Sequence, residues 1–221
     1  MSTVHESGIL LVLSRIKDTA PLSSDIYNDW YNLIHIPEIL NTGGISDAAR
    51  YWADGDKHEE YPYLALYQVP SMSFLDSKDF ESITVHHEML PGPTNSILDV
   101  ASFDFRRYIR VHKFANGNHL RQATGLDICL MSLTFDLPQE QDDAQAWLPK
   151  NIVDPVAAST DQLNAQVYVR WRSISGRYNL SSSTEHEIAE YLVLYWGPRK
   201  LANAIRRHAP ADAVMSIYIK L

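Results

Sequence analysis

The chain has 221 residues, of which 45% are hydrophobic, and it carries a formal net charge of −8 at pH 7. This length can bury one sizeable core or two small ones. The acidic balance argues against a nucleic-acid partner and against an anionic membrane surface. The single cysteine, Cys129, excludes an internal disulfide, and the apolar run GILLVL from Gly8 is too short for a signal peptide or a membrane span. We therefore expect a soluble, cytoplasmic protein without a membrane partner.

The first half of the chain predicts the element order βαββαβ. Apolar and aromatic runs typical of strands alternate with two stretches at helical spacing, and Pro91-Gly92-Pro93 marks a long irregular loop. The predicted elements are a strand over 8–16, a helix from Ser23 or Ser24, strands from Ala48 and over 61–69, a helix over 73–83 and a strand over 103–111.

A second series of the same order follows a polar segment. We expect residues 112–124 to be a linker, so that the first repeat covers 8–111 and the second covers 125–221. The elements predicted in the second repeat are strands over 125–135, 164–172, 190–197 and 213–221 and helices over 142–156 and 198–208.

Matching residues support an internal repeat. Gly8 and Gly125, Trp30 and Trp147, and Tyr51 and Tyr168 are each 117 positions apart. The pattern Tyr-Leu-x-Leu-Tyr occurs at 63–67 and again at 191–195, 128 positions further on. Since several matches follow the same structural order, we predict an α+β fold of two ferredoxin-like βαββαβ repeats. Their two bare sheet faces would pack sheet to sheet as an intramolecular α/β barrel, and the interior of that barrel would be the ligand pocket.

The helix after Ser23 holds the most suggestive side chains. Ile26, Trp30 and Leu33 recur at helical spacing and predict the buried face. Pro37 predicts that the helix ends or kinks at residue 36, which would place His35 in the last turn, where the helix dipole favours the charged imidazole.

Tyr27, Tyr31 and His35 are four residues apart and share one line along this helix. Two phenols and an imidazole in a row can exchange protons with a bound molecule. The alternative interpretation is structural, because a histidine in a last turn is usually a cap and tyrosines at helical spacing are usually packing residues.

Several stretches of the first half resemble the EthD-like proteins of the dimeric α/β-barrel superfamily, here in a tandem-duplicated, single-chain form. The resemblance rests on Trp30-Tyr31, His35-Ile36-Pro37, Ala49-Arg50-Tyr51, the strand from Tyr63, Leu90-Pro91-Gly92 and Phe103-Asp104-Phe105-Arg106. It covers most of residues 8–110, whereas over 125–221 it is limited to strand order and a few side chains.

The resemblance implies a cofactor-independent enzyme of secondary metabolism, because relatives of this fold include polyketide cyclases, decarboxylases, isomerases and monooxygenases. Fold does not fix the reaction. The enzyme would be a lyase, cyclase or isomerase that cyclises, dehydrates or decarboxylates a small aromatic or polyketide-like substrate. Cyclases of the group use a histidine–tyrosine pair, which points to His35 as acid or base and to Tyr31 as donor to an enolate oxygen.

The candidate site lies in the first half. Residues 117 positions after Tyr31 and His35 are Leu148 and Ile152, so the second half lacks the phenol and the imidazole and would be scaffold. Arg50 would bind a carboxylate or form a surface ion pair, and Trp52 and Trp196 are expected inside with the other aromatic residues. The candidate substrate-binding residues are Tyr27, Trp30, Arg50, Tyr51, Trp52, Tyr67, His86, Asp104 and Arg106.

Common nucleotide, hydrolase and zinc motifs are absent from the sequence, and we expect no cofactor and no metal. Two alternatives remain open. One is a non-catalytic barrel that binds haem or another hydrophobic ligand, with His35 or His112 as the iron ligand. The other is a stress- or assembly-related protein whose pocket has lost its function. A homodimer is compatible with each interpretation.

Overall fold

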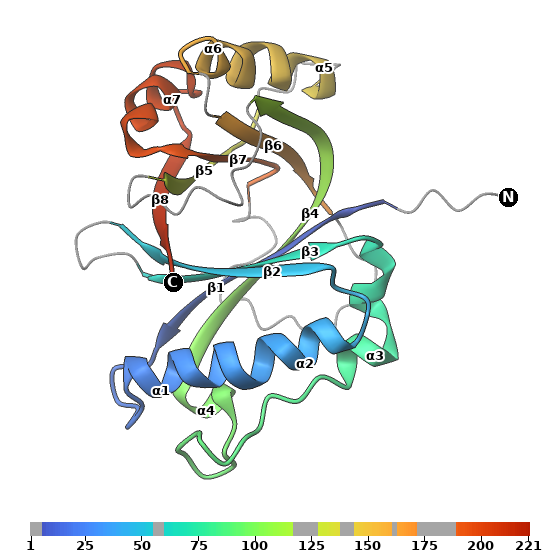
Figure 1. Cartoon of the computed structure of the whole chain (residues 1–221), viewed down its shortest axis with the longest axis vertical. Coiled ribbons are helices and arrows are strands. Elements are labelled where there is room, and N and C mark those ends of the chain that lie inside the picture. Colours follow the sequence, from blue (N-terminus) through green and yellow to red (C-terminus); the bar gives the residue numbers. More distant parts are fainter. Residues whose placement is uncertain (1–5, 55–59, 117–127, 138–143, 161–162, 172–188) are drawn as a thin grey trace, which may run out of the picture. The chain divides into compact units, whose positions relative to one another are not determined.

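The computed structural model describes residues 6–54, 60–116, 128–137, 144–160, 163–171 and 189–221 (Figure 1). The chain divides into two compact units. Among the described residues, the first unit holds those up to Arg50 and those from 60 to Arg107, and the second unit holds the rest.

The sheet of the first unit is antiparallel and has the strand order β4-β1-β3-β2. In the β1–β3 pair, Gly8 lies opposite Val69 and Ser14 opposite Tyr63. Strands β2 and β4 also supply residues to the second unit. The four strands are β1 (Gly8–Ile16), β2 (Asp47–Ala53), β3 (Tyr63–Val69) and β4 (Ala101–Asn116).

One long helix lies along a face of this sheet (Figure 1). It consists of α1 (Ser24–Asp29), the π-helical segment η1 (Trp30–His35) and α2 (Ile36–Asn41), which follow one another without a break. Ser23 is the N-cap, and its Oγ accepts a hydrogen bond from the backbone N–H of Ile26 at 3.3 Å, as predicted.

The prediction that the helix ends near residue 36 is wrong, because Ile36 has α-helical angles and the helix continues to Asn41; the alternative, a kink at this place, stays a prediction. Pro37 lies inside this continuous helix, directly after the π-helical segment, at a place where proline removes one helical hydrogen bond. The wider π turn instead carries the chain past the proline, with the N–H of Ile36 bonded to the carbonyl of Tyr31. His35 consequently lies in the middle of a continuous helix.

The predicted buried face of this helix is also wrong in part. Ile26 is 39% exposed and Leu33 is 65% exposed, whereas Trp30, Tyr27 and Tyr31 are buried. A tyrosine buries a large apolar area, and it can be fully buried when its hydroxyl finds a partner. The Oη of Tyr27 has one, because it donates a 2.7 Å hydrogen bond to Ser14 Oγ on β1. The line of tyrosines therefore faces the sheet.

The helix predicted over 73–83 is divided in two. Its parts are the 3₁₀ helix η2 (Met72–Asp76) and α3 (Lys78–Glu81). Ser77 separates them in an extended conformation and caps α3, since its Oγ accepts from the N–H of Phe80 at 3.2 Å. The long loop that follows contains the short helix α4 (Ile97–Val100) and is held by backbone pairing between His86 and Ser96.

The second unit repeats several of these features. Its sheet has the order β2-β8-β5-β7-β6-β4, and its long helix again contains a π-helical segment. Leu148 and Ile152 are buried in the apolar core of this unit. The elements are β5 (Ile128–Phe135), α5 (Ala144–Leu148), the π-helical segment η3 (Pro149–Val153), α6 (Asp154–Ala157), β6 (Leu163–Arg170), β7 (Tyr191–Pro198), the 3₁₀ helix η4 (Arg199–Leu201), α7 (Ala202–His208) and β8 (Val214–Lys220).

These elements confirm an α+β fold, while its division into ferredoxin-like repeats at 8–111 and 125–221 stays a prediction. Of the predicted linker, residues 112–116 belong to β4, and residues 117–124 lie outside the described residues. In the part of the chain that the structure describes, no helix combines the length and apolar character needed to cross a membrane.

Candidate functional site

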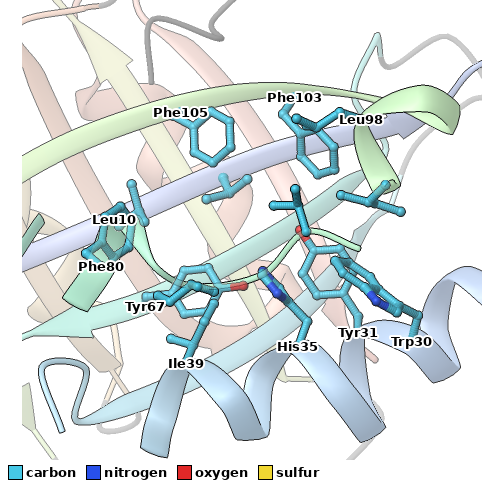
Figure 2. A pocket seen from close by; sticks show the side chains of 14 residues that line it. Leu10, Trp30, Tyr31, His35, Ile39, Tyr67, Phe80, Leu98, Phe103 and Phe105 are labelled. Atoms are coloured by element: carbon cyan, nitrogen blue, oxygen red, sulfur yellow. The ribbon is translucent and has the colours of Figure 1, made fainter. Parts of the chain in front are cut away.

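A small, largely apolar cavity lies in the first unit, between the long helix and the helix-covered face of the sheet (Figure 2). Its volume is about 60 Å³, and it is partly open to solvent. We expected a pocket between two bare sheet faces, but this cavity is enclosed by elements of one unit. Its walls are formed by Leu10, Val12, Trp30, Tyr31, His35, Ile39, Tyr67, Phe80, Ile83, Val85, Ile97, Leu98, Phe103 and Phe105.

The π-helical segment supplies three of these residues. Trp30 and His35 stack with 4.6 Å between ring centroids, and the ring of Tyr31 meets that of His35 edge-on at 5.3 Å. Residues five apart would diverge around an α-helix, but the wider π turn brings them onto one face. The irregular turn therefore clusters an indole, a phenol and an imidazole at the cavity.

His35 is held as the neutral imidazole. Its Nδ1 is buried and has no hydrogen-bond partner within the described part of the chain. Burial, assisted by the positive charge of Arg50, lowers the pKa of His35 from 6.5 to about 4. The predicted stabilisation of the charged form by a helix end is wrong, because the helix continues to Asn41 and burial lowers the pKa of His35.

Two phenols accompany the imidazole at the cavity. Figure 2 shows the hydroxyls of Tyr31 and Tyr67 directed toward the space around the His35 ring. Burial raises the pKa of Tyr31 to about 12, against the opposing effect of Arg50. Burial, together with the nearby Tyr31 hydroxyl, also raises the pKa of Tyr67 well above its ordinary value, and the Tyr67 Oη makes no hydrogen bond of ordinary length to the described residues. Both phenols are thus neutral hydrogen-bond donors at neutral pH.

Arg50 is a buried cation that lies against the ring of Tyr31. Its side chain is 3% exposed, and neither Nη1 nor Nη2 has a hydrogen-bond partner in the residues that the structure describes. Its Cζ lies 4.4 Å from the ring centroid of Tyr31, 5.4 Å from that of Tyr27 and 5.7 Å from that of Tyr63. Three electron-rich ring faces thus replace the carboxylate that a buried arginine usually has.

The other candidate residues do not line the cavity. Tyr51 is buried in the second unit, where its Oη accepts from Trp196 Nε1 at 3.3 Å. Trp52, expected inside, is 40% exposed, and His86 is exposed in the loop. Asp104 and Arg106 pair with each other at 2.7 Å on β4, on the face opposite Phe103 and Phe105.

Several lining residues were not singled out from the sequence. Phe103 and Phe105 alternate with Asp104 along β4, so strand periodicity would have found them once the inward face was known. The loop residues Ile83 and Val85 have no such pattern beyond local alternation. Tyr63, which contacts Arg50, was expected inside with the other aromatic residues, but not as a partner of the arginine.

The second unit offers an internal comparison. Tyr195 follows Tyr67 by 128 positions, and its hydroxyl donates a 2.9 Å hydrogen bond to the carbonyl of Ile152. Ile152 in turn follows His35 by 117 positions. The positions matched by these sequence offsets therefore differ: His35 and Tyr67 carry unpaired buried polar atoms, whereas Ile152 is aliphatic and the Tyr195 hydroxyl is hydrogen-bonded.

The cavity beside His35 does not fit a haem, and His112 does not line it. A cavity of about 60 Å³ is far below the roughly 300–1,000 Å³ of typical cofactor and ligand pockets, and the His35 ring lies flat against Trp30. His112 belongs to the second unit. Among the described residues, no three His, Cys, Asp or Glu side chains gather where they could hold a metal ion.

Comparison with known proteins gives one curated relative. No protein-family model matches the chain. Core atranone cluster protein 1 from Stachybotrys chlorohalonatus is 34% identical over 76 residues, which amount to 34% of this chain and 31% of that protein. The match thus spans about a third of each protein.

Solved structures resemble the chain over nearly its whole length. One is an anthrone oxidase-like protein with 11% identity and a TM-score of 0.52, where the match covers 99% of this chain and 92% of that one. Another is a chlorite dismutase-like protein with 11% identity and a TM-score of 0.54, where the match covers 98% of this chain and 95% of that one. A monooxygenase-like protein from Fusobacterium nucleatum has 9% identity and a TM-score of 0.57, with 99% and 94% covered. The likeness establishes the fold, and membership of the dimeric α/β-barrel superfamily stays a prediction. Membership of the EthD-like group and a tandem duplication stay predictions.

Proposed function

We propose that the chain is a cofactor-independent enzyme of polyketide-type metabolism that moves a proton beside a carbonyl group. The observation that carries the proposal is the meeting of two buried, unpaired polar atoms, His35 Nδ1 and Tyr67 Oη, at an apolar cavity. Unpaired buried groups cost folding free energy, and a ligand that bonds to them would recover it. We also interpret the strand orders of the two units as two ferredoxin-like repeats, with the first as the active one.

The proposed chemistry follows from the protonation states. Neutral His35 has a free lone pair and can accept a proton from the carbon beside a carbonyl. The enolate oxygen that forms would accept hydrogen bonds from Tyr31 and Tyr67, whose high pKa values keep their protons in place. The positive charge of Arg50 disfavours an imidazolium at His35, but a negative enolate in the cavity would offset that repulsion.

Cavity size limits what part of a substrate is held. About 60 Å³ admits only a few atoms, so the reacting carbonyl would lie inside while the remaining chain or rings occupy the open mouth. The mouth includes Leu98 and Phe105, which are apolar and partly exposed. A flexible polyketide or a flat aromatic ketone suits this shape.

The comparisons support this chemistry in part. The name of the curated relative places it in a cluster for atranone, a secondary metabolite, and one structural neighbour is named after the oxidation of anthrone, an enolisable ketone. Cyclisation, dehydration, decarboxylation and isomerisation of such compounds share the proton transfer proposed here. A hydrophobic-ligand carrier without turnover is the second candidate, since the apolar walls alone would serve it.

Deuterium exchange tests the proposal without the natural substrate. Anthrone and α-tetralone would be incubated with the protein in D₂O, and NMR would follow the loss of the enolisable C–H signal, which is that of C10 in anthrone and of C2, beside the carbonyl, in α-tetralone. The native protein should exceed the buffer rate, and His35→Gln should reduce the excess by about 10²–10⁴-fold, as expected for a positioned base. Tyr67→Phe should reduce it as well, because a donor to the enolate oxygen is lost.

Tyr195→Phe is the matched control, since it removes a phenol from the second unit and should leave exchange unchanged. Exchange at the native rate in a folded His35→Gln protein would refute the role of this residue. No exchange above buffer with either ketone would favour the carrier.

A further inference from the structure

We infer that the cavity selects the deprotonated form of a weakly acidic, flat oxygen compound, a phenolate or an enolate, and that Arg50 is the buried cation responsible. This inference rests on the proposed site and names the class of its ligand. It concerns equilibrium binding, so it can be tested without turnover.

The first step is the missing counter-charge. Arg50 is buried, both of its Nη groups lack hydrogen-bond partners, and no ion pair of Arg50 with a carboxylate occurs in the described parts of the chain. A buried charge without an opposite charge is costly, by several kcal/mol in typical cases. Cation–π contacts with three tyrosine rings offset only part of such a cost. An anion in the adjoining cavity would supply the opposite charge.

The second step is the path from Arg50 to the cavity. Arg50 does not line the cavity itself, but its guanidinium lies against the ring of Tyr31, which does. The cation withdraws electron density from that ring and makes the hydroxyl a stronger donor. Arg50 also acts on Tyr67 and His35, since its charge lowers the pKa of both groups. The carboxylate of Asp25 raises the pKa of Tyr63, but Tyr63 does not line the cavity.

The third step is the kind of anion. A carboxylate or phosphate is strongly hydrated and needs several direct charge-assisted hydrogen bonds when it leaves water. The cavity walls offer mainly apolar groups, with the phenols of Tyr31 and Tyr67 as donors and the cation held one ring further away. A phenolate or enolate has one delocalised oxyanion on a flat apolar body, which one or two phenol donors can satisfy. That chemistry matches these walls.

The test compares two small probes of similar shape. 4-Nitrophenol ionises near neutral pH and its anion absorbs in the visible range, whereas 4-nitroanisole cannot ionise. Binding of each would be titrated with the native protein between pH 5.5 and 9. We expect the 4-nitrophenolate anion to bind at least about tenfold more tightly than neutral 4-nitrophenol, which corresponds to a fall of about one unit in the pKa of the bound phenol, and also more tightly than 4-nitroanisole.

Arg50→Met should abolish this preference and retain binding of 4-nitroanisole. Arg15→Met is the matched control, because Arg15 also lies over a tyrosine ring, that of Tyr61 at 5.9 Å, but is exposed, and the change in net charge is the same. Arg15→Met should keep the preference.

The inference is overturned if the native protein binds 4-nitroanisole as tightly as the anion or binds neither probe, a comparison that needs no variant. It is also overturned if a folded Arg50→Met protein keeps the preference. Anion selectivity without deuterium exchange would retain this inference and reject the proposed enzyme. Deuterium exchange without anion selectivity would support the proposed enzyme and reject this inference.

Discussion

Protonation of His35 should make the protein lose stability as the pH falls. In the folded protein, burial and Arg50 lower the pKa of this imidazole to about 4, whereas in the unfolded chain it returns to about 6.5. Between these values the unfolded state binds a proton that the folded state resists, so acid favours unfolding. The full gap corresponds to about 3 kcal/mol, at about 1.4 kcal/mol for each tenfold change.

Urea unfolding at pH 7.5 and pH 4.5 measures this effect. With a folded pKa of about 4 and an unfolded value of 6.5, about 2.5 kcal/mol of unfolding free energy is lost between these two conditions through His35 alone. Carboxylates also titrate in this range, so the native protein is compared with His35→Gln, in which all other groups are retained. The native protein should lose about 2.5 kcal/mol more than the variant. Equal losses would show that His35 is solvated or paired in the folded protein, and would refute the buried neutral imidazole.

Three further predictions concern stability and are measured by urea or thermal unfolding. Tyr195→Phe should lower the free energy of unfolding by about 1–2 kcal/mol, because the buried carbonyl of Ile152 loses its donor. Tyr67→Phe should leave that free energy unchanged or raise it, because it removes an unpaired buried hydroxyl. Equal effects of the two substitutions would contradict this prediction. Ser14→Ala should cost about 1 kcal/mol through the lost acceptor for Tyr27, and no cost would mean that Tyr27 has another partner. Gly44→Ala should cost about 1–3 kcal/mol because its Cβ would overlap the Phe74 ring, and Phe74→Leu in the same chain should recover part of that loss.

The sequence predicted the features that depend on local chemistry. Most strands occur within a few residues of their predicted bounds, because alternation and aromatic content mark them directly. Ser23 caps the long helix, and Tyr27, Tyr31 and His35 share one face as their spacing indicated. These properties depend on neighbours in the chain, which the sequence displays.

Features that depend on tertiary contacts were not predicted. Helical spacing favoured Ile26 and Leu33 as buried residues, but Ser14 on β1 gives Tyr27 a buried partner and the tyrosine face turns inward instead. The proline at 37 indicated a helix end. In the structure a π turn precedes the proline and the helix continues past it, and the hydrogen bonds of a π turn cannot be recognised in the sequence. Arg50 looked like a surface residue, because nothing local indicates that three tyrosine rings surround it.

The two units show which part of the site carries functional information. Both long helices contain a π-helical segment, at Trp30–His35 and at Pro149–Val153, so the irregular turn alone does not define a site. In the second unit the side chains around it are aliphatic or fully hydrogen-bonded, as Ile152 and Tyr195 are. In the first unit the equivalent space holds unpaired polar atoms, each of which costs about 1–3 kcal/mol when buried. A buried unpaired atom also occurs in the second unit, at Asn164 Oδ1, but His35 Nδ1 and Tyr67 Oη belong to residues that line one and the same cavity. The polar groups gathered at this cavity, rather than the backbone that presents them, are therefore the basis on which we propose a ligand site in the first unit.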